Sequence, residues 1–68
     1  METKDANGNI LHDGDNISLI KDLKIKGGKL KRGAVARNIS LYPDDNSIVD
    51  GKINKIEMVL KTEYFQKV

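Results

Sequence analysis

The sequence has no cysteine and no tryptophan, only one proline and one histidine, and its aromatic residues are two tyrosines and one phenylalanine. Without cysteine, neither a disulfide nor a thiolate metal site can strengthen a small core, so apolar packing and backbone pairing must hold the fold. A single histidine also falls short of the several ligands that a metal-pair hydrolase needs. We therefore expect no enzyme, no catalytic residue, no metal and no cofactor.

The chain is 68 residues long, and a chain of this length buries only about 60% of the surface that it exposes when unfolded. We expect one domain over residues 1–68, of which the polar residues 1–7 are flexible. No apolar run approaches the roughly 20 residues of a membrane span, and the first residues lack the apolar stretch of a signal peptide. These features predict a soluble, cytoplasmic protein that has no membrane partner.

Charge is distributed unevenly along the chain, although the net charge is only +2. Residues 1–20 carry one lysine against four acids, a net −3, whereas residues 21–37 carry seven bases against one acid, a net +6. The bases of this block are Lys21, Lys24, Lys26, Lys29, Lys31, Arg32 and Arg37. Such a block can attract polyanions in a salt-sensitive way. It is equally typical of a solvated loop that keeps a small domain soluble.

Alternation of apolar and polar residues predicts several short strands and no amphipathic helix. The predicted strands cover residues 15–20, 34–41, 47–53 and 56–60, and a last short strand ends at Val68. Between the first two, Leu23, Ile25 and Leu30 predict an excursion packed on the core, with a reversal at residues 27–28. Four or five short strands in so short a chain favour an all-β fold, and an SH3-like barrel of about five strands is the natural candidate.

Three local features refine this prediction. A bulge near Asn38 would turn Arg37 outward. In the strands over 47–53 and 56–60, alternation places six residues inward and Val59 outward; the six are Val49, Gly51, Ile53, Ile56, Met58 and Leu60. After them, we expect a single helical turn capped by Thr62, with Tyr64 or Phe65 closing the core.

Several stretches resemble a known family: Gly14-Asp15, Lys21-Asp22-Leu23-Lys24, Lys26-Gly27, Lys31-Arg32-Gly33, Asn38-Ile39 and Leu60-Lys61. Over about residues 5–67 the chain resembles the C-terminal domain of the PhnA-like family, labelled alkylphosphonate-utilisation proteins. The resemblance implies an SH3-like barrel with no established reaction. Longer members resemble a zinc ribbon joined to this barrel, and the chain has no cysteine to carry the zinc half.

Alternation in the flanking strands predicts a two-residue hairpin link at residues 54–55, which departs from the family, in which Asp-Gly is common. A positive φ at Lys55 is less comfortable than at glycine, so a turn longer than two residues is the alternative.

Other candidate chemistry is weak. His12, Asp13 and Asp15 around a glycine could form a weak metal site, but the pattern is more typical of a turn. Residues 44–46 lack the ligand spacing of a calcium loop, and residues 26–33 lack the spacing and the following helix of a phosphate-binding loop. With no cysteine and one histidine, no nucleophile and base can be assembled.

Two hypotheses of function remain. The first is an accessory or protein-interaction module whose molecular function is unassigned, with Val59 as a contact for an unknown protein partner or a second copy. The alternative is weak, sequence-nonspecific binding of nucleic acid or another polyanion through residues 21–37, using Lys24, Lys26, Lys29, Lys31, Arg32 and Arg37. Few aromatic residues are available to stack on bases or to line a groove for proline-rich peptides. The sequence names neither a partner nor an oligomeric state.

Overall fold

The computed structural model describes residues 2–68 and confirms the all-β prediction; Met1, part of the stretch predicted to be flexible, lies outside the described residues. The elements in chain order are β1 (Ile17–Leu19), β2 (Leu23–Ile25), β3 (Gly28–Leu30), β4 (Val35–Tyr42), β5 (Asp45–Ile53), β6 (Ile56–Lys61), the 3-10 turn η1 (Thr62–Tyr64) and β7 (Phe65–Lys67). No helix of residues 2–68 is long and apolar enough to cross a membrane.

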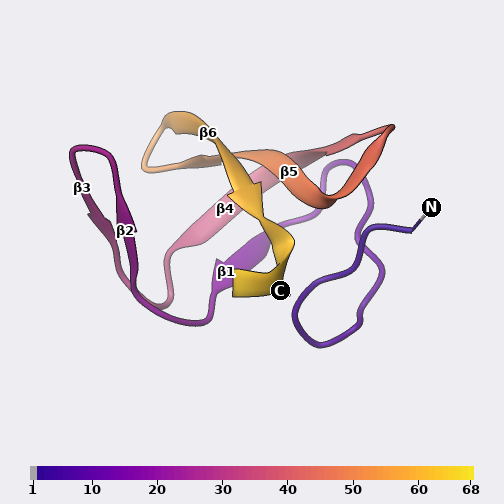
Figure 1. Ribbon diagram of the computed structural model, residues 1–68, viewed down its shortest axis with the longest axis horizontal. Coiled ribbons are helices and arrows are strands. Elements are labelled where there is room, and N and C mark those ends of the chain that lie inside the picture. The colour runs from indigo at the N-terminus through magenta and orange to yellow at the C-terminus, as the bar shows by residue number, and fades with distance from the viewer. Residues whose placement is uncertain (1) are drawn as a thin grey trace.

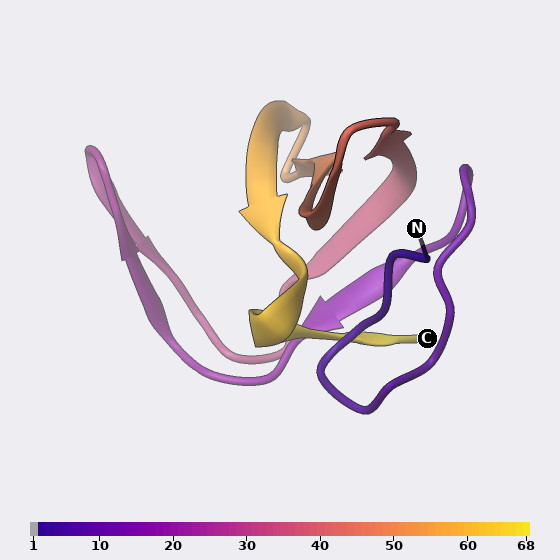
Figure 2. The same ribbon diagram turned by 45° about the vertical axis from the view of Figure 1, so that its right-hand side comes forward.

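Five strands form one antiparallel sheet in the order β6-β5-β4-β1-β7 (Figure 1). Strands β4, β5 and β6 follow one another as a meander, and η1 then leads the chain to β7, which pairs with β1. Strands β2 and β3 pair only with each other and form a hairpin that stands away from the sheet (Figure 2). The sheet edges are therefore β6 and β7.

A single apolar core lies on the inner side of the sheet. Its buried residues are Leu11, Ile17, Leu19, Leu30, Ala36, Ile39, Val49, Ile53, Leu60 and Phe65. Gly51 faces this core, where an added Cβ would lie 3.1 Å from both Ala36 Cβ and Leu60 Cδ1. Phe65 is fully buried, which confirms that it closes the core.

The bulge predicted in the strand over 34–41, which is β4 of the structure, is confirmed. Asn38 has a φ of 54°, and the pairing of β4 with β5 shifts register between Arg37 and Ser40. Because of this shift, Ala36 and Ile39 are both buried while Arg37 between them is exposed. The bulge therefore keeps a charged side chain out of the core, as buried unpaired charge would be costly.

The hairpin between β5 and β6 has a two-residue turn at residues 54–55, which confirms the predicted link, and the alternative of a longer turn was wrong. Asn54 and Lys55 adopt φ values of 53° and 68°, the left-handed conformations of a type I′ turn. This turn matches the twist of its flanking strands, which pair from Ile53 and Ile56 onward. The pairing outweighs the unfavourable backbone conformation of a lysine.

Three predicted side-chain positions were wrong. Ile56 was expected inward but is 62% exposed, because it adjoins the turn where the hairpin extends beyond the core. Ile25 is exposed for a similar reason, since it lies next to the tip of the β2–β3 hairpin. Thr62 does not cap η1 but is its first residue, and its buried hydroxyl lies 3.5 Å from the carbonyl oxygen of Ser47.

The N-terminal segment packs along β7. Lys4 and Ile10 form a bridge, and the amide of Ala6 donates to the carbonyl of Phe65 at 2.8 Å. The carboxylate of Asp5 accepts the amide of Lys67 at 2.6 Å. The flexibility predicted for residues 1–7 stays a prediction, but the burial of Asp5 in this segment was not foreseen. We call residues 2–11 the arm.

Candidate functional site

Most bases of the block at residues 21–37 lie on or beside the β2–β3 hairpin. Lys24 and Lys29 lie directly opposite each other across the hairpin, and Lys26 lies at its tip beside Gly27. All six predicted polyanion-binding residues are exposed, namely Lys24, Lys26, Lys29, Lys31, Arg32 and Arg37. Within residues 2–68, none of the six is in salt-bridge contact with a carboxylate.

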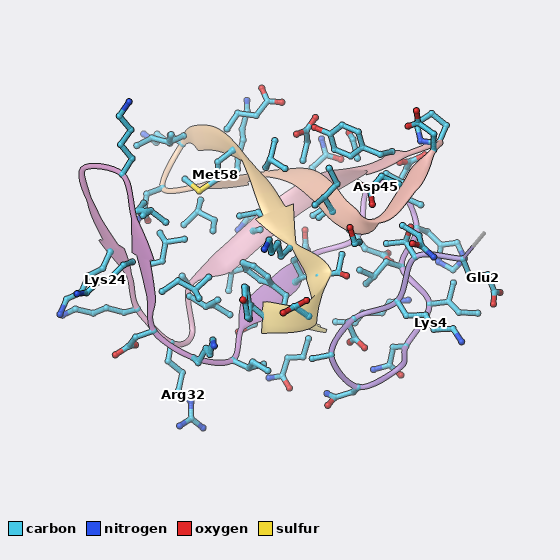
Figure 3. All side chains as sticks on the ribbon, in the orientation of Figure 1. Glu2, Lys4, Lys24, Arg32, Asp45 and Met58 are labelled. Atoms are coloured by element: carbon cyan, nitrogen blue, oxygen red, sulfur yellow. The ribbon has the colours of Figure 1, made fainter. Side chains whose placement is uncertain are left out.

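The base of the hairpin is anchored while its tip is free. The amide of Arg32 donates to the Asp22 carboxylate at 2.7 Å, and the amide of Gly33 donates to the carbonyl of Leu19 at 2.8 Å. Buried Leu30 joins the hairpin to the core. The hairpin therefore presents its lysines on a short support at one end of the molecule, where Lys24 and Arg32 lie far from Glu2 and Lys4 (Figure 3).

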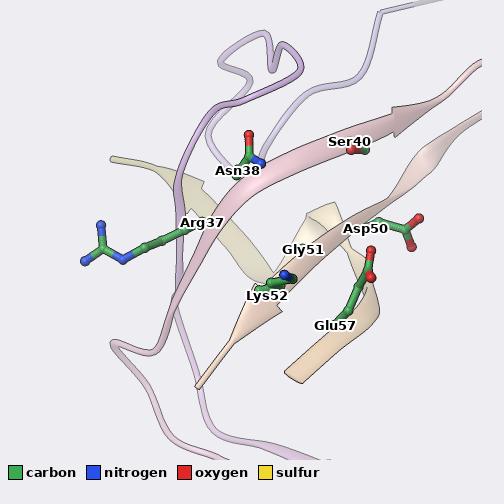
Figure 4. Close-up of a pocket in the computed structure, with 7 residues that line it drawn as sticks. All are labelled: Arg37, Asn38, Ser40, Asp50, Gly51, Lys52 and Glu57. Atoms are coloured by element: carbon green, nitrogen blue, oxygen red, sulfur yellow. The ribbon is translucent and has the colours of Figure 1, made fainter. Parts of the chain in front are cut away.

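The outer face of β4, β5 and β6 carries two rows of paired residues. In one row Arg37 lies opposite Lys52, which lies opposite Glu57; in the next, Asp50 separates Ser40 from Val59. The seven residues around an open hollow of about 260 Å³ are Arg37, Asn38, Ser40, Asp50, Gly51, Lys52 and Glu57 (Figure 4). The Arg37 side chain extends away from the others, toward solvent.

A second hollow, of about 490 Å³, adjoins the first and shares Arg37, Asn38 and Lys52 with it. It adds Val35 from the start of β4 and the turn residues 54–55, so that its ionisable side chains are all basic. Position along the chain did not indicate Lys52 and Lys55 as members of the basic surface, because both lie outside the basic block at residues 21–37. Only the pairing of β4 with β5 brings Lys52 beside Arg37.

The acids of this face lie on the side of the first hollow. The Tyr42 hydroxyl donates to the Asp50 carboxylate at 2.6 Å. This hydrogen bond raises the pKa of Tyr42 above its ordinary value, and partial burial and the charges of Asp50 and Glu57 raise it further. The tyrosine therefore stays protonated and acts as a donor rather than as a base.

The carboxylates of the turn around His12, those of Asp13 and Asp15, accept hydrogen bonds from backbone amides. Asp15 accepts the amide of His12 at 2.8 Å, and Asp13 accepts the amide of Leu41 at 2.7 Å. The His12 amide lowers the pKa of Asp15, burial opposes this effect, and Lys67 lowers the pKa further. No group of three or more histidines, cysteines, aspartates or glutamates within residues 2–68 is arranged to hold a metal ion.

The two edges of the five-stranded sheet differ. The outer side of β7 is covered, because Phe65 and Lys67 bond to the arm. Strand β6 pairs with β5 alone, and no other described strand adjoins its outer side. Val59, predicted to point outward, is 57% exposed on this strand. The sequence indicated the direction of the Val59 side chain but not that its strand is a sheet edge.

Comparison with known proteins agrees with the predicted resemblance. The PhnA domain, also described as YjdM, matches residues 3–68. The chain is 49% identical over 67 residues to protein YjdM of Escherichia coli and 47% identical over 66 residues to a YjdM homologue of Haemophilus influenzae. Each match covers 94% of this chain but only 60% and 51% of the respective relative. Because the domain match spans nearly the whole chain, the protein belongs to the PhnA domain family.

Proposed function

We propose that this domain is a non-enzymatic interaction module that binds a protein partner through the open edge strand β6. The observation that carries the proposal is the contrast between the two sheet edges: the arm covers β7, whereas no other strand of residues 2–68 adjoins the outer side of β6. Proteins usually cover, twist or charge their edge strands, since an uncovered one is a template for another strand. An exposed edge is also the surface on which extended peptides add to a sheet.

The backbone of β6 supports this proposal. Ile56, Met58 and Leu60 lie opposite inward-facing residues of β5. In a hairpin with a two-residue turn, the two residues that flank the turn exchange backbone hydrogen bonds, and so does every second pair after them. Ile56, Met58 and Leu60 therefore bond to β5 through their N–H and C=O groups. The N–H and C=O groups of Glu57 and Val59 then point to the open side. The N–H of Lys61 does so as well, but its C=O accepts the first bond of η1, of which Lys61 is the N-cap. These three alternate residues can therefore bond to an added strand.

We further propose that the fold is an SH3-like barrel and that the protein works in the cytoplasm. The strand order β6-β5-β4-β1-β7 and the 3-10 turn before the last strand support the barrel. A link to phosphonate metabolism has only the family label behind it, so the proposal concerns binding rather than a pathway.

A selection of displayed random peptides tests the interaction proposal. Peptides are selected on the wild-type domain and measured against Val59→Pro, which removes an N–H that points away from β5 and so leaves the β5–β6 pairing intact. We expect the selected peptides to lose binding to Val59→Pro but not to the control Val68→Ala, which trims an exposed valine beyond β7. Peptides that bind Val59→Pro as well as the wild type would contradict the proposal.

A second candidate function, polyanion binding, is favoured by the two pairs of like charges. Lys24 lies opposite Lys29, and Arg37 lies opposite Lys52. Like charges directly opposite each other in a sheet are destabilising. Pairs of like charges that weaken the fold are typical of functional surfaces, because a bound anion relieves the repulsion between them.

This second candidate is tested by titrating a short single-stranded oligonucleotide at several salt concentrations. If Lys29 contacts phosphate, Lys29→Gln lowers the affinity and reduces the slope of log K against log salt by about 0.7. The control Lys4→Gln removes the same charge at the other end of the molecule. Equal effects of both substitutions would mean that only net charge matters, and the hairpin would then be a solvated loop.

A further inference from the structure

We propose that the strand added at the β6 edge is β6 of a second copy, in a two-fold antiparallel dimer centred on Val59. The inference rests on the proposed function, because it names the partner of the same open edge. In an antiparallel pair centred on Val59, this residue faces itself, and Glu57 faces Lys61 of the second copy. The two-fold axis repeats the opposite-charge pair on the other side.

The backbone groups suit this arrangement. Glu57, Val59 and Lys61 are the residues that become directly opposed pairs. Val59 exchanges two hydrogen bonds with Val59 of the second copy, as opposed residues of this kind do in an antiparallel ladder. Lys61 donates its N–H to the carbonyl of Glu57, since its own C=O belongs to η1. The same three side chains share the outer face, because they alternate with Met58 and Leu60. Val59, which is 57% exposed, would then gain an apolar neighbour at the two-fold axis.

Charge specifies the register. Shifting the two strands by two residues in one direction brings Lys61 toward the turn residue Lys55 of the second copy. Shifting them in the other direction brings Glu57 toward Glu63 in η1. Only the register centred on Val59 pairs opposite charges within β6, whereas both neighbouring registers bring like charges near each other, which disfavours them. A one-residue shift would instead turn inward-bonding residues toward the partner.

The arm limits the assembly to two copies. Once the β6 strands are joined, the remaining edges of the continuous sheet are the two β7 strands. Each β7 is covered by its own arm, through the amide of Ala6 and the carboxylate of Asp5. An isologous contact that uses up the open edge closes the assembly, so the structure fits a dimer rather than a fibre.

Sedimentation equilibrium over a range of concentrations tests the charge pairing. Glu57→Lys and Lys61→Glu each convert both attractive pairs into repulsive ones, and we expect each to raise the dimer dissociation constant about tenfold. The double variant Glu57→Lys/Lys61→Glu restores opposite charges and should restore dimerisation. Glu2→Lys and Lys4→Glu make the same charge changes in the arm and should leave the dimer unaltered. Thermal melts of each variant confirm folding.

Cross-linking gives a second, independent measurement. The sequence has no cysteine, so Val59→Cys introduces a single thiol. Directly opposed, hydrogen-bonded residues of an antiparallel pair have Cα atoms about 5.5 Å apart, within disulfide reach. Mild oxidation should therefore link Val59→Cys into a covalent dimer much faster than the control Val68→Cys. Equal linking of the two variants would overturn the proposed register.

A monomeric wild type at millimolar concentration would overturn the dimer. If selected peptides still lose binding to Val59→Pro, the proposed function of β6 as a partner-binding edge stands without the dimer. If the wild type is monomeric and peptide binding does not depend on Val59, the proposed function is contradicted as well. A dimer that resists both charge reversals, or that the double variant fails to restore, would place the interface elsewhere and overturn the inference.

Discussion

At the scale of single residues, Asp5 joins the two ends of the chain. Its carboxylate accepts the amides of Asn7, Asn9 and Lys67 and the side-chain amide of Asn9, at 2.6 to 3.1 Å. The residue is almost fully buried. Burial raises the pKa of the Asp5 carboxyl, but the bonds from Lys67, Asn9 and Asn7 bring it below its ordinary value. Because these four hydrogen bonds are donated to the ionised carboxylate, Asp5 stabilises the fold in its charged form.

We expect Asp5→Asn to lower the free energy of unfolding by about 1–3 kcal/mol, because an amide nitrogen cannot accept the bond from Lys67. The folded-state pKa of Asp5 lies below the unfolded value of about 3.9. The contribution of Asp5 is therefore complete above that value and is lost as the pH falls through the folded-state pKa. Urea titrations at pH 6 and pH 2 should show a difference between the two proteins that shrinks at the lower pH. A difference independent of pH would contradict the assigned role.

Gly51 gives a second prediction at this scale. An added Cβ would lie 3.1 Å from Ala36 and Leu60 and 3.3 Å from Ile39, all of them core atoms. We expect Gly51→Ala to destabilise the fold by about 1–3 kcal/mol through overpacking. The control is Gly28→Ala in β3, where no atom lies within 4 Å of the added Cβ. Thermal unfolding of the two variants measures the difference, and equal melting temperatures would show that the core can expand.

At the scale of elements, the bulge and the strands could be predicted from the sequence, whereas the sheet edges could not. The bulge near Asn38 was predictable because regular alternation would have buried Arg37. The strand over 47–53 was predictable because its inward residues alternate strictly, and all three are buried. By contrast, neither the covering of β7 by the arm nor the meeting of Arg37 with Lys52 was predictable, since both depend on which distant strands pair. Local patterns specify strands, whereas the sheet order decides which edges stay open.

The β5–β6 turn gives the prediction at this scale. Lys55 holds a φ of 68° that glycine adopts without strain. Asn-Gly is the preferred sequence of a type I′ turn, so we expect Lys55→Gly to stabilise the hairpin by about 0.5–1 kcal/mol. A chemical denaturation midpoint is the measurement. The control Lys52→Gly, in the middle of β5, should destabilise the protein instead.

At the scale of the whole molecule, charge is arranged along one axis. The protein measures 32 Å by 20 Å by 16 Å, with the basic hairpin at one end of the longest axis and the arm at the other. The arm belongs to the acidic stretch of the sequence, whereas the hairpin belongs to the basic one. The two proposed binding surfaces therefore differ in character: one is a charged projection, and the other is a strand edge in the body of the fold.

Removing residues 2–9 should change how the molecule assembles. The deletion takes away Asp5 and Ala6 and so leaves the outer side of β7 without its partners. With both edges open, the same chain can extend in two directions, and open-ended association becomes possible. We expect light scattering to show species larger than a dimer that grow with concentration. Assembly that stays at the wild-type size would mean that β7 needs no cover.

The bonds between the arm and β7 also bear on folding kinetics. Asp5 and Lys67 are 62 positions apart in the sequence, so their contact closes almost the whole chain. Contacts of such long range slow folding, because the entropy of loop closure is lost before the contact forms. A nascent chain therefore cannot complete this fold until its final strand has left the ribosome. The domain should appear in one late step during synthesis rather than growing strand by strand.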